Sequence, residues 1–111
     1  MPSDLLCGPQ LLNPDAGALI RLLVLAPALE EWVLRAGLQH WWLRRGYGAV
    51  NGVLLCAAVF CVLHAGAGWQ RALLVGPPAL VLGALYQRWR RWWLCAAVHC
   101  AMNAFALLAC L

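Results

Sequence analysis

Long apolar stretches separated by short polar connections organise the whole chain. The first stretch follows a helix-start sequence at residues 13–15, where Asn suits a cap and Pro suits the first turn, and it continues to Trp42. Three more stretches cover residues 49–67, 72–86 and 92–111, and two of these approach the roughly 20 residues that cross a hydrocarbon core. The pattern predicts an all-α protein, an integral membrane bundle of about four transmembrane helices.

Prolines interrupt two of these stretches. Pro27 lies in the middle of the first stretch, which is too long for one straight span, and a proline removes a backbone hydrogen bond. We therefore expect the first helix to be kinked or broken at Pro27, with Glu30 and Glu31 on the part that resumes after it. Pro77-Pro78 predict that the third helix is interrupted.

The composition agrees with a lipid environment. The chain has 111 residues, of which 65% are hydrophobic and 11% charged, and its mean hydropathy is +0.76. Soluble domains have about 45–50% apolar residues, and a bundle this short with apolar outer faces would expose more hydrophobic surface than a soluble monomer tolerates. We therefore expect residues 1–111 to form a single membrane-embedded domain.

Arginine and tryptophan gather at the ends of the stretches. All eight basic residues are Arg, and most lie in short connections beside Trp, as in the aromatic belts of membrane proteins. This sorting accounts for the net charge of +4, so we expect membrane lipid, and no nucleic acid, as a partner. The positive-inside rule places five arginines on the cytoplasmic side and both termini outside: Arg44, Arg45, Arg88, Arg90 and Arg91.

The cysteines do not form a recognisable disulfide framework. They contain no CxxC spacing, and the pairs five residues apart point to different sides of a helix and cannot be bridged. The N-terminus lacks the basic segment and long apolar run of a secretory signal, so no cleaved targeting peptide is expected. We expect all six cysteines to be small packing residues: Cys7, Cys56, Cys61, Cys95, Cys100 and Cys110.

Three charged residues lie within the first apolar stretch. A charge at the centre of a bilayer costs about 2.5–3.5 kcal/mol on insertion scales, so Glu30, Glu31 and Arg35 must face protein or trapped water. At about 100° per residue, Arg35 lies about 40° from Glu31 but about 140° from Glu30. Glu before Arg at this spacing is the favoured order for an ion pair. The sequence therefore predicts a Glu31–Arg35 pair and a Glu30 that is free.

Two further stretches carry polar residues four positions apart. FCVLH places His64 after Phe60, and HCAMN places Asn103 after His99. A lone histidine in a membrane is more often a hydrogen-bonded packing residue than a catalyst. Polar stripes on three separate helices instead favour a shared polar cavity.

The motifs EEWVLR, FCVLH and HCAMN resemble the signature of the CAAX protease and bacteriocin-processing family of intramembrane glutamic endopeptidases. That signature is EExxxR, then FxxxH, then HxxxN on successive membrane helices, and the resemblance covers the chain from about Pro27 to its end. It implies an endopeptidase that hydrolyses a peptide bond of a membrane-associated protein or peptide. A CAAX-like tail, a C-terminal sorting signal and a bacteriocin leader are all substrates of this kind.

The resemblance also implies a role for each matching residue. Glu30 and His64 would activate a water for attack on the scissile carbonyl. His99 and Asn103 would donate hydrogen bonds to the oxyanion that develops. The mechanism implied is of the glutamic type, with no metal and no cofactor.

Other matching residues would support this site, namely Glu31, Arg35 and Phe60. The chain departs from the family pattern because it has barely the four-helix core, and because LRAG replaces the commoner FRG after the glutamates. Its size is similar to that of the small glutamic-type proteases of bacterial C-terminal sorting systems. The resemblance therefore implies a multi-pass protein of a bacterial inner membrane.

Three other functions use the same residues. A zinc-dependent membrane protease would ligate its metal with Glu30, His64, His99, Cys61 and Cys95, although no HExxH motif is present. A catalytically inactive relative would act as an immunity or abortive-infection factor. A proton or ion relay would also need buried polar groups of this kind.

Overall fold

The computed structural model describes Cys7 and residues 13–110, and it contains helices and no strand in this part of the chain. One unbroken helix, here named the first helix, spans residues 16–44 and consists of α3 (Ala16–Ile20), the π-helical η1 (Arg21–Leu25), α4 (Ala26–Glu31), the π-helical η2 (Trp32–Gln39) and α5 (His40–Arg44). It is followed by α6 (Ala49–Leu63), the 3₁₀ turn η3 (Ala65–Ala67), α7 (Trp69–Leu74), α8 (Gly76–Trp89) and α9 (Trp92–Ala109). The all-α prediction is confirmed for the described residues.

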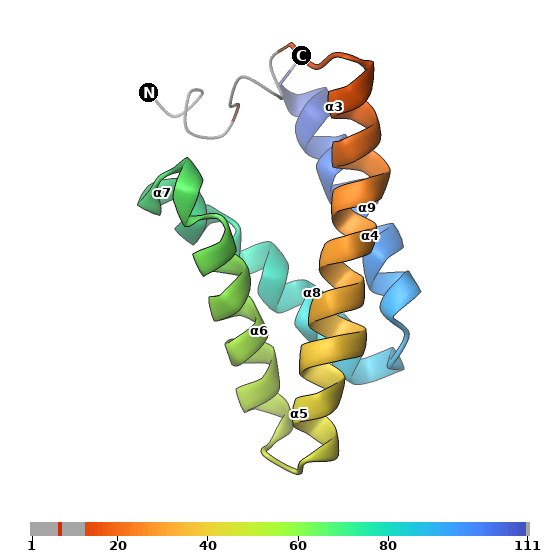
Figure 1. Ribbon diagram of the computed structural model, residues 1–111, viewed down its shortest axis with the longest axis vertical. Helices are drawn as coiled ribbons and strands as arrows, with labels where there is room; N and C mark the ends of the chain where they lie inside the picture. The colour runs from red at the N-terminus through yellow and green to blue at the C-terminus, as the bar shows by residue number, and fades with distance from the viewer. Residues whose placement is uncertain (1–6, 8–12, 111) are drawn as a thin grey trace.

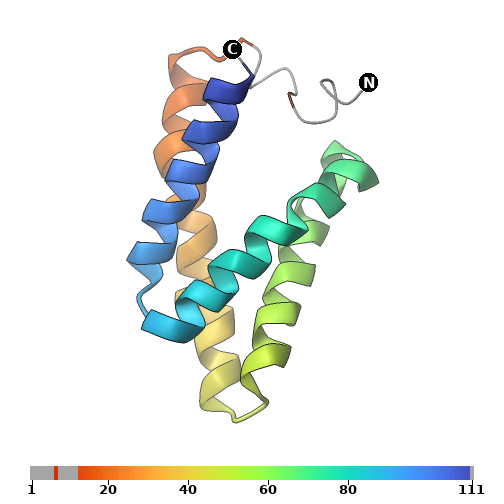
Figure 2. The ribbon, with the colours of Figure 1, turned by 180° about the vertical axis from the view of Figure 1, so that it is seen from behind.

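The helices form two pairs that diverge toward one end of the molecule. Figures 1 and 2 show α9 beside the upper part of the first helix, and α6 packed on α8, which crosses obliquely from α7 to the start of α9. The start of α3 and the end of α9 lie at the end where the two pairs are farthest apart (Figure 1). The Arg-rich connections after α5 and before α9 lie away from that end.

The first helix begins at Ala16 with Asp15 as its cap, so Pro14 precedes the helix and does not lie in its first turn as expected. The helix is not broken at Pro27. Just before Pro27 the hydrogen bonds widen to π-helical spacing, so that the Ala26 N–H donates to the carbonyl of Arg21. With this spacing, the carbonyl of Leu22 would accept a hydrogen bond from the backbone nitrogen of residue 27. That residue is Pro27, which has no N–H, so the carbonyl is left without a partner in its own helix. The side-chain amide of Asn103 on α9 donates to that carbonyl instead, at 2.7 Å. Of the two predicted alternatives, a kink or a break, the break is wrong, because a wide turn and a donor from another helix accommodate the proline.

The predicted interruption of the third stretch is confirmed. Helix α7 ends at Leu74, Val75 forms a turn, and α8 starts at Gly76. Pro77 and Pro78 therefore lie in the first turn of α8, where the backbone N–H groups have no partner within the helix. The prolines allow a new helix to begin at this point, and they do not disturb its interior.

Close helix contacts and two apolar clusters hold the bundle together. A Cβ added at Gly83 of α8 would lie only 2.9 Å from a side-chain carbon of Val53 on α6, so glycine is needed for the close approach of these two helices. One cluster, between the first helix, α6 and α8, contains Leu34, Ala57, Phe60 and Ala79. The other, between α8 and α9, contains Leu82, Tyr86 and Cys95.

Two of the six cysteines form a disulfide, which corrects the prediction that all are packing residues. Cys7 is bonded to Cys110 at the end of α9, with their Cα atoms 5.6 Å apart. These residues are 103 positions apart in sequence, and only the fold brings the start of the chain to the end of α9. The other four cysteines are free, and Cys56 and Cys95 are buried as predicted.

The outer faces of the helices are largely apolar. Among the described helices, Trp92–Ala109 is by length and composition the one that is long and apolar enough to cross a membrane, and Ala49–Leu63 is apolar but shorter. Soluble proteins rarely expose large contiguous apolar patches. Large apolar side chains that are more than half exposed include Ile20, Val24, Leu29, Leu54, Val62, Leu73, Val81, Phe105 and Leu108.

Candidate active site

The predicted ion pair within the first helix is present. Arg35 Nε donates to Glu31 Oε1 at 2.8 Å, and both side chains are fully buried. The π-helical η2 segment begins directly after Glu31, and the pair still closes at a spacing of four residues. Removing either partner alone would leave a buried charge uncompensated. The pair is therefore a fixed part of the site.

Glu31 also contacts α9, which the sequence did not indicate. Its second oxygen, Oε2, lies 2.8 Å from Nδ1 of His99. A carboxylate that is paired with Arg35 can only accept hydrogen bonds. In its contact with Glu31, Nδ1 of His99 is therefore the donor. The Glu31 carboxylate therefore fixes the orientation and the protonated nitrogen of the imidazole, and the other nitrogen of the ring faces Glu30.

Glu30 lies on the other side of the same imidazole and is the more accessible of the two glutamates. Its Oε2 is 3.6 Å from Nε2 of His99, and its side chain is 28% exposed, whereas that of Glu31 is fully buried. The prediction that Arg35 forms its ion pair with Glu31 and not with Glu30 is confirmed. The site thus has one buried carboxylate bound to arginine and one that is partly exposed.

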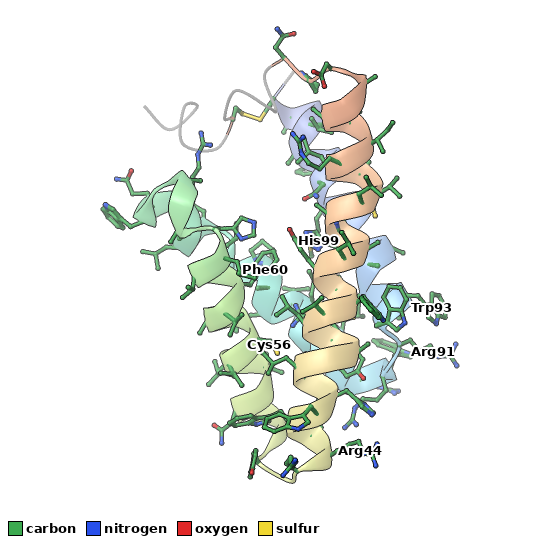
Figure 3. The ribbon with its side chains drawn as sticks, viewed as in Figure 1. Arg44, Cys56, Phe60, Arg91, Trp93 and His99 are labelled. Carbon is green, nitrogen blue, oxygen red and sulfur yellow. A yellow bond between two sulfur atoms is a disulfide. The ribbon has the colours of Figure 1, made fainter. Side chains whose placement is uncertain are left out.

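His64 approaches the site through an aromatic contact. It caps α6, and its Nδ1 is 2.8 Å from the carbonyl oxygen of Phe60. The Phe60 ring centroid lies 4.5 Å from that of His64 and 5.7 Å from that of His99, so Phe60 touches both imidazoles. Figure 3 shows Phe60 and His99 on facing sides of the space between α6 and the first helix. Among the described contacts, none joins His64 directly to Glu30, so a shared water would have to connect them.

Asn103 lies one helical turn beyond His99 and is turned toward the first helix. Its amide donates to the carbonyl of Leu22 at 2.7 Å, as described for the turn before Pro27. An Asn amide has two N–H donors, so one remains for another acceptor. Asn103 thus ties α9 to the first helix beside the site, and its role as an oxyanion donor stays a prediction.

A further polar residue, Gln39, extends the network and was not among the predicted site residues. Arg35 donates from one terminal nitrogen to Gln39 Oε1 at 3.3 Å and from the other to the carbonyl of Ala79 at 3.2 Å. Gln39 donates in turn to the carbonyl of Gly83 at 3.0 Å. Glu31, Arg35 and Gln39 follow one another at a spacing of four residues, and this spacing is the signal that could have identified Gln39.

No group of three or more His, Cys, Asp or Glu side chains that could hold a metal ion occurs in the described part of the chain. Two of the cysteines considered as zinc ligands have other surroundings. Cys95 donates to the carbonyl of Leu82 at 3.5 Å, and Cys61 lies within van der Waals distance of a Cβ built at Gly76. The acidic and imidazole groups near Glu30 are therefore arranged as hydrogen-bond partners.

The comparison with protein families gives first the class of the protein and then its family. The chain matches a family of membrane-embedded proteases, for which the hydrolysis of peptide bonds is the common reaction. The matching family model is that of the type II CAAX prenyl endopeptidase Rce1-like proteins, and it covers residues 13–105. The chain belongs to this family, which confirms the resemblance carried by the three motifs. No curated protein and no solved structure gave a match.

Proposed function

We propose that the protein is an intramembrane endopeptidase of the glutamic type, in which Glu30 activates the attacking water. The observation that supports this most directly is the convergence of Glu30, Glu31 and His99, with one carboxylate bound to Arg35 and the other accessible. A buried ion pair beside a free carboxylate gives two acidic groups different tasks in one site. Glu31 holds His99, and Glu30 performs the proton transfer.

In the proposed reaction, a water bound between Glu30 and His64 loses a proton to the Glu30 carboxylate and attacks the scissile carbonyl. The carbonyl oxygen becomes an oxyanion that accepts hydrogen bonds from His99 Nε2 and from the free N–H of Asn103. In this step His99 would donate from both ring nitrogens, from Nδ1 to Glu31 and from Nε2 to the oxyanion, which requires the imidazolium form. When the tetrahedral intermediate collapses, the C–N bond breaks and Glu30 returns the proton to the leaving amine.

The expected substrate is a membrane-associated protein or peptide, and lipid is the expected surrounding. A CAAX-like tail, a sorting-signal anchor and a bacteriocin leader each present a cleavable bond next to an apolar anchor, which suits a site between apolar helices. Incubating the reconstituted protein with one peptide of each class and identifying products by mass spectrometry tests the substrate class. Cleavage of none of the three would contradict the proposal.

The location proposed is a bacterial inner membrane with both termini outside. Two independent features support this orientation: the arginines of the connections after α5 and before α9, and the Cys7–Cys110 disulfide beside the end of α9. Arginines favour the cytoplasmic side, whereas disulfides persist in oxidising compartments.

A labelling experiment is expected to show this orientation. Arg44, which is exposed at the Arg-rich end (Figure 3), is replaced by Cys, and Gln70 of α7 is replaced by Cys as the matched control at the other end. In intact cells a membrane-impermeant thiol reagent should modify Gln70→Cys and not Arg44→Cys, relative to the unsubstituted protein. Modification of Arg44→Cys alone would reverse the topology.

Peptide cleavage is expected to be independent of metal, because a carboxylate activates the water and side-chain donors bind the oxyanion. Turnover of the purified protein should stay within about twofold of its starting value after dialysis against a chelator, since no metal-bound water takes part. Loss of turnover on chelation, with recovery on addition of zinc, would favour the zinc-dependent alternative.

A further inference from the structure

Gln39 lies at the far end of the polar network from His99. Its side chain is fully buried, like those of Arg35 and Glu31. Four contacts lead from His99 to α8: His99 to Glu31 at 2.8 Å, Glu31 to Arg35 at 2.8 Å, Arg35 to Gln39 at 3.3 Å, and Gln39 to the carbonyl of Gly83 at 3.0 Å. The network therefore crosses the bundle from α9 through the first helix to α8.

The position of Gln39 requires a side chain that accepts on one side and donates on the other. Its Oε1 faces the guanidinium of Arg35, and its Nε2 faces the carbonyl of Gly83. A carboxylate has no N–H for Gly83 and would compete with Glu31 for Arg35, and an apolar side chain would leave a buried N–H of Arg35 unpaired. An amide satisfies both neighbours without adding a charge.

We infer that Gln39 is a positioning residue for the peptidase reaction, acting through Arg35 and Glu31 on the imidazole of His99. This inference rests on the proposed function, because it concerns the same site. Since Arg35 is held by Gln39 and by the carbonyl of Ala79, its guanidinium stays fixed opposite Glu31. Glu31 can then hold His99 in one orientation, as carboxylates bonded to the far nitrogen of an imidazole do for metal-bound histidines.

The charged and titratable groups around His99 come from three helices. Glu30, Glu31 and Arg35 lie on the first helix, His64 caps α6, and Cys56 of α6 is bonded to the carbonyl of Leu34 on the first helix. On α9 itself the neighbour is Cys95, one helical turn away, whose thiol is bonded to a backbone carbonyl of α8. Of these groups, Arg35 is the one that contacts Gln39. A change at Gln39 therefore reaches His99 through Arg35 and Glu31.

The test compares Gln39→Glu and Gln39→Met with Tyr86→Phe in the full chain reconstituted in nanodiscs. Tyr86 of α8 is hydrogen-bonded to His40 of the first helix at 3.1 Å, so Tyr86→Phe also removes a hydrogen bond between these two helices but leaves the network intact. Two quantities are measured: the NMR signal of the His99 Nδ1–H proton, assigned by its loss in His99→Gln, and the values of kcat and KM for a cleaved peptide.

In Gln39→Glu the new carboxylate draws Arg35 away from Glu31, so Glu31 no longer holds the imidazole in one orientation and the signal of the His99 Nδ1–H proton shifts. We expect kcat to fall about tenfold with KM within about twofold, because the substrate still binds but the imidazole is misplaced. Gln39→Met should also change the signal and lower kcat. This second variant provides the test if Gln39→Glu does not fold. Tyr86→Phe should lower thermal stability and leave both the signal and kcat unchanged.

The inference is overturned if neither Gln39 variant moves the His99 signal, if Tyr86→Phe moves it equally, or if the signal moves and kcat stays unchanged in an active protein. A wild-type protein without peptidase activity would contradict the proposed function instead. The NMR signal would then still decide whether Gln39 positions His99.

Discussion

Replacing Glu30 by Gln is expected to give a folded protein that has lost about 10²- to 10⁴-fold in turnover, the range that a general base contributes. The amide keeps the size of the side chain but cannot accept the proton of the attacking water. Folding should be preserved, because Glu30 is partly exposed and its one described polar contact is the 3.6 Å approach to His99. Turnover divided by the amount of folded protein, measured together with the melting temperature, checks both expectations.

A Glu30→Gln protein that retains full turnover would contradict the assignment of the base. A Glu30→Gln protein that melts far below the wild type would instead assign Glu30 a structural role. Leu29→Ala is a matched control, since Leu29 is the neighbouring residue on α4 and its side chain is exposed. This control should leave turnover unchanged.

Replacing Glu31 by Gln is expected to destabilise the protein by about 3–5 kcal/mol, the typical cost of breaking a buried ion pair. Arg35 would keep its charge without a carboxylate, in a site from which water is excluded. The two carboxylate oxygens accept separately from Arg35 and His99, and an amide replaces one of these oxygens with an NH₂ group, which can only donate. Yield and melting temperature should therefore fall, and turnover per folded molecule should fall with them because His99 is no longer held.

A double variant separates the two effects of this substitution. Combining Glu31→Gln with Arg35→Met removes the stranded charge while leaving an amide oxygen for His99. The double variant should be more stable than Glu31→Gln alone, since replacing both members of a buried pair costs less than removing one. Equal stability of the single and double variants, measured by thermal unfolding in the same lipid, would show that the charge of Arg35 is not the cause.

Much of the bundle follows from local rules that act within a few residues. The spacing of Glu31 and Arg35 on one helix predicted their ion pair, and the dipeptide Pro77-Pro78 predicted that the third helix is interrupted. These predictions depend on helical geometry and on the missing N–H of proline, both of which can be read from the sequence.

The features that the sequence did not indicate all depend on contacts between distant segments. Pro27 does not break its helix, because Asn103, 81 residues away from Leu22, donates to the carbonyl that proline leaves unpaired. The Cys7–Cys110 disulfide likewise requires the start of the chain to lie beside the end of α9. Neither partner can be recognised before the helices are placed.

The same reason explains what was missed in the candidate site. The sequence assigned Glu31 to Arg35 alone, whereas its second oxygen lies against His99, 68 residues away. The spacing of four residues from Arg35 could have identified Gln39, but its contact with the carbonyl of Gly83 on α8 could not be foreseen, because a backbone carbonyl carries no signature in the sequence.

The most direct measurement is the cleavage of a membrane-anchored peptide by purified wild-type protein and by Glu30→Gln, in equal folded amounts in the same liposomes, with products identified by mass spectrometry. The wild type should release two fragments with a new carboxylate at one internal peptide bond, and Glu30→Gln should release almost none. Fragments formed at equal rates by both proteins would contradict a peptidase that depends on Glu30.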